Sequence, residues 1–523
     1  MTLMLNLCLK MRIIKNSILN TINFDLLCFT YILIMNSFAH IRGLLNYYYC
    51  YPDVSLMYYY YKLFKDNLFP TDFFANYMFY SSNWLRISEG YLYLGKFVDF
   101  IYLIKVISFI FSITFFLFLY LLIKNIYNKK YSLFFLIFSF PLLLSMDSFY
   151  GAQPRFFGFL FSLIAFYGSL KGECKIILLC IIGALIFYPQ IIPSLLVLYA
   201  IHVLFNWSDL KRKRKIVYIV IFISAFIGIF SLKSEENIYL FNNYGIYKKV
   251  SIESLTSIKL LLYNYIFNID EHAVLYKVFI FIYLFFLIFI VCIFPRVFYN
   301  SFKKNFFFLF SHILSFIILF FMFEGAICSR QLIFSLPLVI IFMTSEITYN
   351  LYKNKLFNHT LIRIILFLIM VSSCFIIKFN NSFDYMNQKE LFDYFSRLNN
   401  DIIIAGHPYT ISMFPIFTQK QAVIVEPATA YMLSLDLLSK YQEIEDDLAK
   451  ALTTSSPKRV ANFEKKYCIS HWVIDEELIM KGNSPEQPGV FINKIPIPSE
   501  IPYLIKSAKL NGIKIGRFLI LEK

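Results

Sequence analysis

The sequence predicts an all-α polytopic bundle of transmembrane helices, followed by a C-terminal extracytoplasmic α/β domain. Hydrophobic residues make up 59% of the 523 residues and charged residues only 16%, a balance that no soluble domain of this size tolerates. The chain offers about eleven long apolar segments, each near the length of a membrane span. Beyond residue 377 the composition becomes that of an ordinary soluble domain. We therefore expect the bundle in residues 1–377 and the α/β domain in residues 378–523.

The apolar segments are expected to be helices. A hydrocarbon core about 30 Å thick requires about 20 apolar residues in each helix. Leu, Ile and Phe fill the segments without the alternation of polar and apolar residues that marks a barrel strand. The predicted spans cover residues 20–40, 100–123, 131–147, 156–171, 176–189, 191–207, 216–232, 273–295, 305–323, 331–352 and 359–377.

Basic residues lie in every second connection between these spans. Examples are Lys10 near the N-terminus, the uninterrupted run Lys211 to Lys215, and Lys303. Because Lys and Arg accumulate on the cytoplasmic side, this pattern predicts an inside N-terminus and an outside C-terminus. The basic excess of these connections is about equal to the net charge of +16, so the charge reports topology and contact with anionic membrane lipid. No nucleic-acid partner is indicated.

The first outer loop, residues 41–99, is too long and too apolar for a simple connector. Aromatic residues and scattered charges alternate in it, as in short helices that lie at the membrane interface. Asp53 follows Tyr51 and Pro52 near the start of the loop, which predicts a carboxylate held at a fixed depth near the outer surface. The alternative is that Asp53 is a solvated turn residue.

Two further outer loops carry charged residues. Asp147 and Arg155 lie in a short loop at membrane depth, where charges are usually paired or functional. The planar guanidinium of Arg155 suits a phosphate, although an Asp147–Arg155 ion pair that pins the loop is the alternative. The last outer loop contains Glu324 and Arg330, followed by an apolar run and Leu336-Pro337 at the start of a late span.

The Arg330 segment with its following proline resembles that of many polyprenyl-phosphate-dependent membrane glycosyltransferases of the GT-C class. Asp53 resembles the acidic residue that this class carries after its first span, and Asp147 lies where some members carry a second acid. The sequence departs from the class in one respect, because Asp53 is followed by Val54, where adjacent acids are common. The resemblance covers the topology of residues 20–377.

The resemblance implies transfer of a hexose or pentose from a polyprenyl-phosphate donor to an acceptor hydroxyl on the outer face. Asp53 and Asp147 would be the catalytic acids, and Arg155, Arg330 and Glu324 would bind substrate. A carboxylate can deprotonate the acceptor hydroxyl, and arginines can stabilise the leaving phosphate. Some members of the class use a divalent cation, but no ligand set in this sequence demands one. The expected location is a bacterial cytoplasmic membrane.

Two other function classes fit a polytopic chain. One is a transporter or flippase of lipid-linked material, and the other is a non-catalytic membrane protein that serves in assembly. The sequence shows no clear internal repeat and no matching pair of Gly- or Pro-broken spans, which are typical of many transporters. Long outer loops and a sizeable outer domain favour the enzyme.

The C-terminal domain is predicted from alternating strands and helices. Strands are expected at residues 401–406, 421–426, 469–475 and 516–521, and helices at residues 433–452 and 458–466. There is no glycine-rich dinucleotide motif and no P-loop, so nucleotide binding is not indicated. His407 and Glu426 lie at strand ends, where α/β folds place ligands, although both also suit ordinary turn positions.

Overall fold

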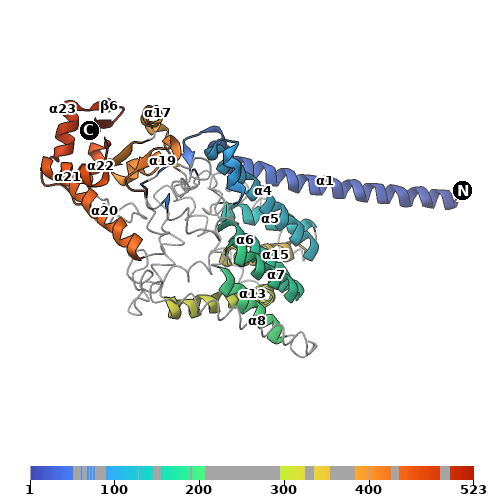
Figure 1. Cartoon of the computed structure of the whole chain (residues 1–523). Coiled ribbons are helices and arrows are strands. Elements are labelled where there is room, and N and C mark those ends of the chain that lie inside the picture. The colour runs from blue at the N-terminus through green and yellow to red at the C-terminus, as the bar shows by residue number, and fades with distance from the viewer. Residues whose placement is uncertain are drawn as a thin grey trace.

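The computed structural model describes residues 2–50, 61, 68–69, 71–72, 75–76, 90–127, 129–144, 155–188, 191–205, 295–323, 335–353, 383–399, 401–425, 435–482 and 495–523. Two parts are seen in this portion of the chain, a bundle of apolar helices and a smaller C-terminal unit that contains a sheet (Figure 1). Here "C-terminal unit" means the described residues from Phe383 onward.

Eight described helices match eight of the eleven predicted spans. The other three predictions, residues 216–232, 273–295 and 359–377, lie outside the described residues, except that residue 295 is the first residue of α13. The helices are α1 (Thr2–Leu45), α4 (Phe100–Ile126), α5 (Lys129–Leu143), α6 (Arg155–Lys171), α7 (Cys174–Phe187), α8 (Ile192–Phe205), α13 (Pro295–Phe323) and α15 (Leu336–Lys353). The first helix is longer than predicted, because it begins at Thr2 and extends away from the bundle (Figure 1).

Two of the described helical segments are long and apolar enough to cross a membrane by length and composition. They are Phe24–Leu45, the second half of α1, and Phe100–Ile126, which is all of α4. Five further apolar helical segments in the described residues are shorter: Tyr131–Pro141, Phe156–Lys171, Cys174–Phe187, Ile192–Leu204 and Asn305–Ser315.

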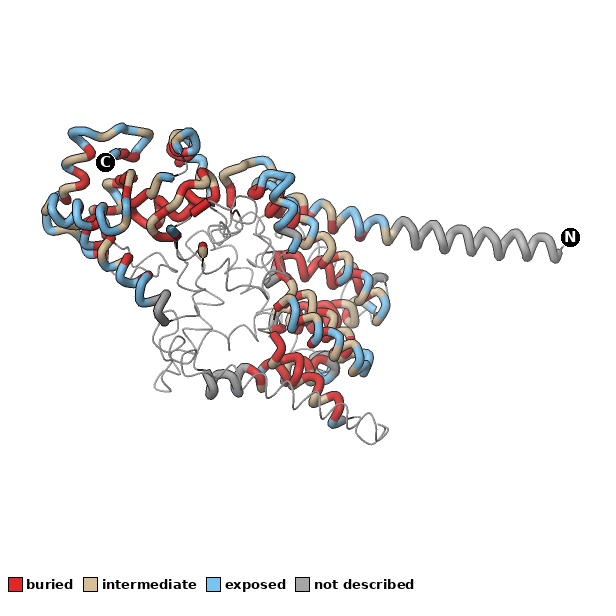
Figure 2. The backbone as a smooth tube through the Cα atoms, in the orientation of Figure 1, coloured by how far each residue is buried: buried red, intermediate tan, exposed pale blue. Residues whose placement is uncertain are grey.

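Aromatic side chains fill the space between the helices. Phe116 of α4 stacks on Phe140 of α5, with ring centroids 4.1 Å apart. Phe166 of α6 contacts Phe308 of α13 and Phe342 of α15, at 4.6 and 4.0 Å. Such contacts add dispersion energy to the packing of the helices. Buried residues accordingly follow the inward faces of the helices (Figure 2).

The C-terminal unit is built on a five-stranded mixed sheet with strand order β4-β3-β5-β7-β6. Its strands are β3 (Ile403–Gly406), β4 (Gln421–Ala422), β5 (His471–Ile474), β6 (Ile513–Ile515) and β7 (Phe518–Glu522). Strands β4, β3 and β5 are parallel to one another, whereas β7 is antiparallel to both of its neighbours, β5 and β6. The predicted last strand is thus the second strand of a hairpin, and β4 is shorter than predicted.

Helices cover this sheet. They are α17 (Lys389–Ser396), α18 (Pro408–Ile411), α19 (Phe414–Thr418), α20 (Leu435–Thr453), α21 (Pro457–Tyr467), α22 (Glu476–Lys481) and α23 (Tyr503–Asn511). The predicted helices near residues 433–452 and 458–466 correspond to α20 and α21. Trp472 of β5 is fully buried, and its indole N–H donates to Glu464 of α21 at 2.9 Å. This bond satisfies the polar end of the largest core side chain.

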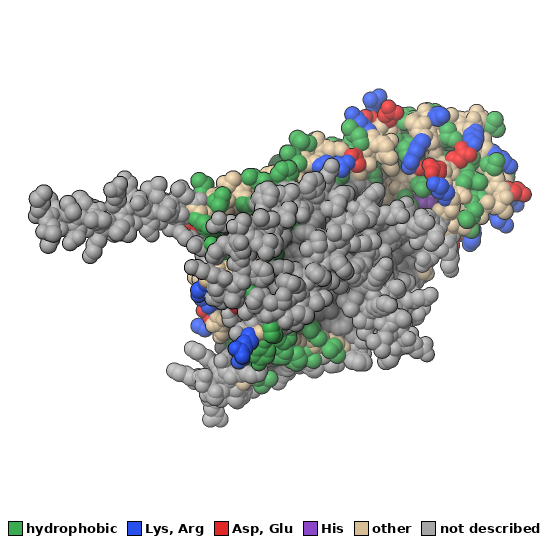
Figure 3. Space-filling view, turned by 180° about the vertical axis from the view of Figure 1, so that it is seen from behind, with side chains coloured by type: hydrophobic (Ala, Val, Ile, Leu, Met, Phe, Trp, Pro, Cys, Tyr) green, Lys and Arg blue, Asp and Glu red, His purple; other side chains and the backbone are tan. Residues whose placement is uncertain are grey.

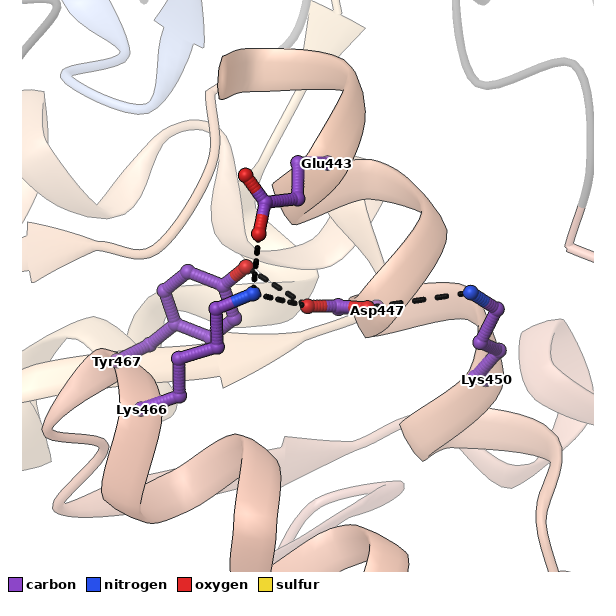
Figure 4. A network of polar contacts seen from close by, with 5 residues as sticks. All are labelled: Glu443, Asp447, Lys450, Lys466 and Tyr467. Carbon is purple, nitrogen blue, oxygen red and sulfur yellow. Dashed lines mark hydrogen bonds and ion pairs between the residues drawn. The ribbon is translucent and has the colours of Figure 1, made fainter. Parts of the chain in front are cut away.

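A polar network joins α20 to α21 (Figure 4). Lys466 donates to Glu443 and, at 2.8 Å, to Asp447, and the Tyr467 hydroxyl donates to Asp447 at 2.9 Å. Burial opposes ionisation of Asp447, but the hydrogen bonds from Lys466 and Tyr467 hold its pKa below its usual range. Lys466 and Glu443 are about half exposed, so the network links two helices at the surface. Charged side chains gather on this unit, whereas the described bundle surface is mainly hydrophobic (Figure 3).

Candidate functional site

The five residues predicted to form the site lie at or beyond the edges of the described segments. Asp53, Asp147, Glu324 and Arg330 are outside the described residues. Arg155 is the first residue of α6, and its side chain is not described. The helix ends that flank these residues are described, and they determine where each loop leaves the bundle.

The end of α1 lies against the start of α4. Lys105 is nearly buried in α4, and its ammonium donates to the carbonyls of Asn46 and Tyr47, at 2.8 and 2.7 Å. Asp99 caps the first turn of α4 and accepts from the Tyr47 hydroxyl at 3.2 Å. We call this end of the bundle the docking end. The described chain continues from α1 to Cys50, and Asp53 is three residues farther along the sequence.

Ring contacts show which other helix ends lie there. Because Phe116 of α4 meets Phe140 near the end of α5, α5 runs toward the docking end. Tyr131 at the start of α5 contacts Tyr349 near the end of α15, so α15 begins on the side of the bundle nearer the docking end and runs away from it. Helix α6 runs parallel to α4, because Phe111 stacks on Phe156 near the start of α6, while Asn125 bonds Tyr167 near its end.

The loops that contain the predicted site residues therefore join helix ends on one side of the bundle. The loop with Asp53 follows α1, the loop with Asp147 connects the end of α5 to the start of α6, and Arg330 precedes α15.

The C-terminal unit attaches to the same end through a small antiparallel sheet. Strand β1 (Tyr49–Cys50), just after α1, pairs with β2 (Phe383–Asp384). Arg42 forms an ion pair with Asp384 at 3.0 Å, and the Asn46 amide donates to the same carboxylate at 3.1 Å. Burial opposes ionisation of Asp384, but the Met386 amide, Arg42 and Asn46 outweigh it and hold its pKa below the usual range.

An aromatic cluster lies beside this sheet. Phe417 of α19 contacts both Tyr47 and Tyr48, and Tyr48 also stacks on Phe392 of α17. The Tyr48 hydroxyl donates to Asp393 at 3.1 Å, and burial together with this carboxylate raises the pKa of Tyr48 to about 12. Farther along the chain, the buried Tyr61 hydroxyl donates to a backbone carbonyl of α19 at 2.9 Å.

The sequence suggested that the C-terminal domain could pack on the bundle and position the first loop, but the residues that make the attachment were not predicted. Arg42 and Asp384 are 342 residues apart, and two-residue strands carry no readable alternation of side chains. The run of tyrosines from Tyr47 to Tyr49 was a signal, because tyrosine needs both an apolar contact and a partner for its hydroxyl when it is buried.

The interior of the bundle contains polar side chains that the prediction did not use. His312 of α13 is fully buried, and its Nδ1 lies 2.8 Å from the carbonyl of Phe308. Glu346 of α15, a helix that packs against α13, is 4% exposed. In the part of the chain that the structure describes, no three His, Cys, Asp or Glu side chains are placed to hold a metal ion.

No protein-family model and no curated protein matches this sequence. Among solved structures, the oligosaccharyltransferase of Archaeoglobus fulgidus in complex with Zn and sulfate matches with a TM-score of 0.48 and 10% identity, over 87% of this chain and 68% of that chain. The same enzyme, named AglB, in complex with an inhibitory peptide and a dolichol-phosphate matches with a TM-score of 0.46 and 10% identity, over 87% and 70%. At TM-scores below 0.5, these likenesses carry no argument about this chain.

Proposed function

We propose that this protein is an integral membrane glycosyltransferase of the GT-C type. It moves a sugar from a polyprenyl-phosphate donor to an acceptor hydroxyl on the outer side of the membrane. Residues 1–377 form the membrane bundle, with the N-terminus inside, and residues 378–523 form the outer domain. The proposed location is a bacterial cytoplasmic membrane.

One observation carries the proposal. The ends of α1 and α5 and the starts of α6 and α15, which adjoin Asp53, Asp147, Arg155 and Arg330 in the sequence, lie toward the same end of the bundle, and the C-terminal unit attaches at that end. A site assembled from several loops requires this arrangement, because catalytic groups must lie within hydrogen-bond reach of one substrate. Had the flanking helix ends lain at opposite ends of the bundle, the residues could not have formed one site.

The proposed reaction exchanges one bond to the anomeric carbon for another. The bond between this carbon and the donor phosphate oxygen breaks, and a bond to the acceptor hydroxyl oxygen forms. Asp53 takes the proton of the hydroxyl, with Asp147 as the second acid. Arg155 and Arg330 stabilise the charge on the leaving polyprenyl phosphate, and Glu324 contacts substrate. Asp53 and Asp147 are the carboxylates available to a divalent cation, and no step is assigned to a metal.

Substitution of Asp53 by Asn tests the proposal. The expected result is a loss of transfer of about 10²–10⁴-fold, because Asn cannot accept the proton, with donor-lipid binding retained. Asp72→Asn is the matched control in the same loop. The Asp72 carboxylate accepts from the backbone of Ala75 at 2.9 Å, a role that an Asn side chain can keep. Equal transfer by wild type and Asp53→Asn would remove Asp53 from the mechanism.

Transport of lipid-linked material is the second candidate, and one observation favours it. His312 and Glu346 are buried on two packed helices inside the bundle, and intramembrane ionisable residues often mark a substrate or proton path. Reconstituted vesicles separate the two functions. Movement of a lipid-linked sugar across the bilayer, without transfer to any acceptor, would support transport and contradict the enzyme.

A further inference from the structure

The carboxyl ends of the three parallel strands in the C-terminal unit form the edge at which such sheets bind ligands. Two of these strand ends have structural roles. After β4, Val425 exchanges backbone hydrogen bonds with the Tyr441 hydroxyl. After β5, Asp475 accepts from the Leu478 amide at 3.3 Å and lies 2.9 Å from Arg517 in an ion pair. The groups named at these two strand ends therefore have hydrogen-bond or ion-pair partners within the unit.

The end of β3, the central strand of the three, is different. His407 follows β3 and is 1% exposed, yet neither ring nitrogen has a hydrogen-bond partner among the described residues. His407 occupies the N-cap position of α18, but its side chain makes no capping hydrogen bond. Buried polar groups are nearly always paired in folded proteins, so folding does not account for this imidazole.

A second polar atom accompanies the imidazole. The backbone amide of Thr410 donates to the His407 carbonyl at 2.8 Å, one turn into α18. The Thr410 hydroxyl is also buried and without a hydrogen-bond partner in the described part of the chain. The Tyr409 ring lies nearly parallel to the imidazole, with centroids 5.5 Å apart. The imidazole thus lies beside an aromatic ring, and a second unpaired hydroxyl lies three residues farther along the chain.

This group belongs to the face of the unit that meets the first outer loop. The segment that begins at His407 continues through α18 into α19, where the Ile416 carbonyl accepts from Tyr61 and Phe417 contacts Tyr47. Strand β3, which precedes His407, lies very close to β5: a Cβ added to Gly406 would lie only 2.5 Å from the Val473 carbonyl oxygen. The backbone that presents His407 is therefore fixed.

We propose that His407 and Thr410 bind a hydroxyl group of an uncharged carbohydrate, the acceptor of the transfer reaction. The choice of ligand class rests on the proposed function and on charge. Burial lowers the pKa of His407 to about 4, so the imidazole is neutral at pH 7. A neutral imidazole and a hydroxyl can each donate and accept, which suits a sugar hydroxyl, whereas a phosphate is bound most strongly by cationic side chains.

His407→Leu tests the inference, because folding and binding predict opposite effects. Removing an unpaired buried polar group leaves the unfolding temperature unchanged or raises it, whereas loss of a binding group weakens carbohydrate binding. The binding probe is a set of methyl glycosides of glucose, galactose, mannose and N-acetylglucosamine, tested by thermal shift on the full-length protein in detergent. At least one glycoside should stabilise the wild type, and His407→Leu should abolish that shift.

Two further variants complete the test. Thr410→Val removes the hydroxyl with little change of shape and should reduce the same shift. His471→Leu is the matched control, because His471 is a buried histidine of the same sheet whose Nδ1 lies 3.0 Å from the Ser470 hydroxyl. This variant should lower the unfolding temperature and keep the glycoside shift. The absence of any glycoside shift in the wild type, or an equal shift in His407→Leu, would overturn the inference.

Steady-state kinetics of sugar transfer distinguish failure of this inference from failure of the proposed function. If wild type transfers sugar, His407→Leu should raise the acceptor KM by about tenfold or more and leave the donor KM unchanged, because only the acceptor contact is lost. His407→Gln, which can still donate and accept, should recover part of the loss. A wild type that shows the glycoside shift but no transfer would refute the proposed function and leave the carbohydrate site standing.

Discussion

Arg42, near the end of α1, lies 3.0 Å from Asp384, the last residue of β2, and joins two parts of the chain that are 342 residues apart. The same carboxylate accepts from Asn46 and from the Met386 amide, at 3.1 Å each. This pair and the β1–β2 strands hold the end of α1 against the C-terminal unit.

Replacing Asp384 by Asn should destabilise the protein modestly and change its response to acid. The side chains of Arg42 and Asp384 are 53% and 33% exposed, so solvent screening limits the loss to about 0.5–1 kcal/mol. The pKa of Asp384 is held below its ordinary value of 3.8. Its contribution is therefore present above that value and is lost as the pH falls through the lower, folded-state pKa.

Thermal unfolding as a function of pH measures this effect. The wild type should lose the Asp384 contribution at acid pH, and Asp384→Asn should not, so the two curves converge as the pH falls. Asp446→Asn, on the exposed face of α20, is the control and should follow the wild-type curve. Parallel curves for wild type and Asp384→Asn would contradict the ion pair.

The β1–β2 pairing predicts an engineered disulfide. Cys50 is directly opposite Phe383 in the antiparallel register, and such pairs have Cα atoms about 4.5–5.5 Å apart, within the range of a disulfide. Phe383→Cys should form a bond with Cys50 on mild oxidation and stabilise the protein by about 2–4 kcal/mol. Peptide mass analysis without reduction detects the bond. With Cys50→Ser as a second substitution the bond should not form, and free thiols at 50 and 383 after oxidation would contradict the pairing.

Gly406→Ala should destabilise the C-terminal unit by about 1–3 kcal/mol through overpacking. A Cβ at this position would lie 2.5 Å from the Val473 carbonyl oxygen and 2.9 Å from the Ile411 side chain, and the backbone oxygen cannot move away without disturbing β5. The fluorescence of the buried Trp472 reports unfolding. Gly90→Ala is the control, because no atom lies within 4 Å of the added methyl group, and a similar loss in both variants would contradict the close approach of β3 and β5.

If the proposed function holds, Arg330→Lys should lower kcat/KM for the polyprenyl-phosphate donor by about tenfold, since lysine keeps the charge but loses the planar fork with which arginine binds phosphate. The acceptor KM should remain unchanged. Arg296→Lys, at the start of α13, is a matched substitution outside the proposed site and should behave as wild type. Equal donor kinetics in all three proteins would remove Arg330 from phosphate binding.

Much of the fold follows from local pattern. Eight predicted spans coincide with described helices, and the predicted strand before His407 is β3. These elements were predictable because apolar length and side-chain period are properties of a continuous segment. Helix α23 and strand β6 were not predicted. Each is short, and its stability comes from packing against β7 rather than from its own sequence.

The residues of the candidate site could be chosen from the sequence, but the contacts around it could not. Asp53, Asp147, Arg155, Glu324 and Arg330 were chosen from residue type and position, and their roles stay predictions. Nothing in the sequence indicated that Asp384 pairs with Arg42, or that the buried imidazole of His407 has no hydrogen-bond partner among the described residues.

The sequence by itself determined the apolar helices, the change of composition after residue 377 and the alternation of basic connections, because each depends on residues that are neighbours along the chain. The tertiary structure decided which helix ends lie toward the docking end, how the C-terminal unit attaches there, and that the imidazole of His407 has no hydrogen-bond partner among the described residues. These depend on contacts between residues hundreds of positions apart, and such contacts leave no periodic signal in a single sequence.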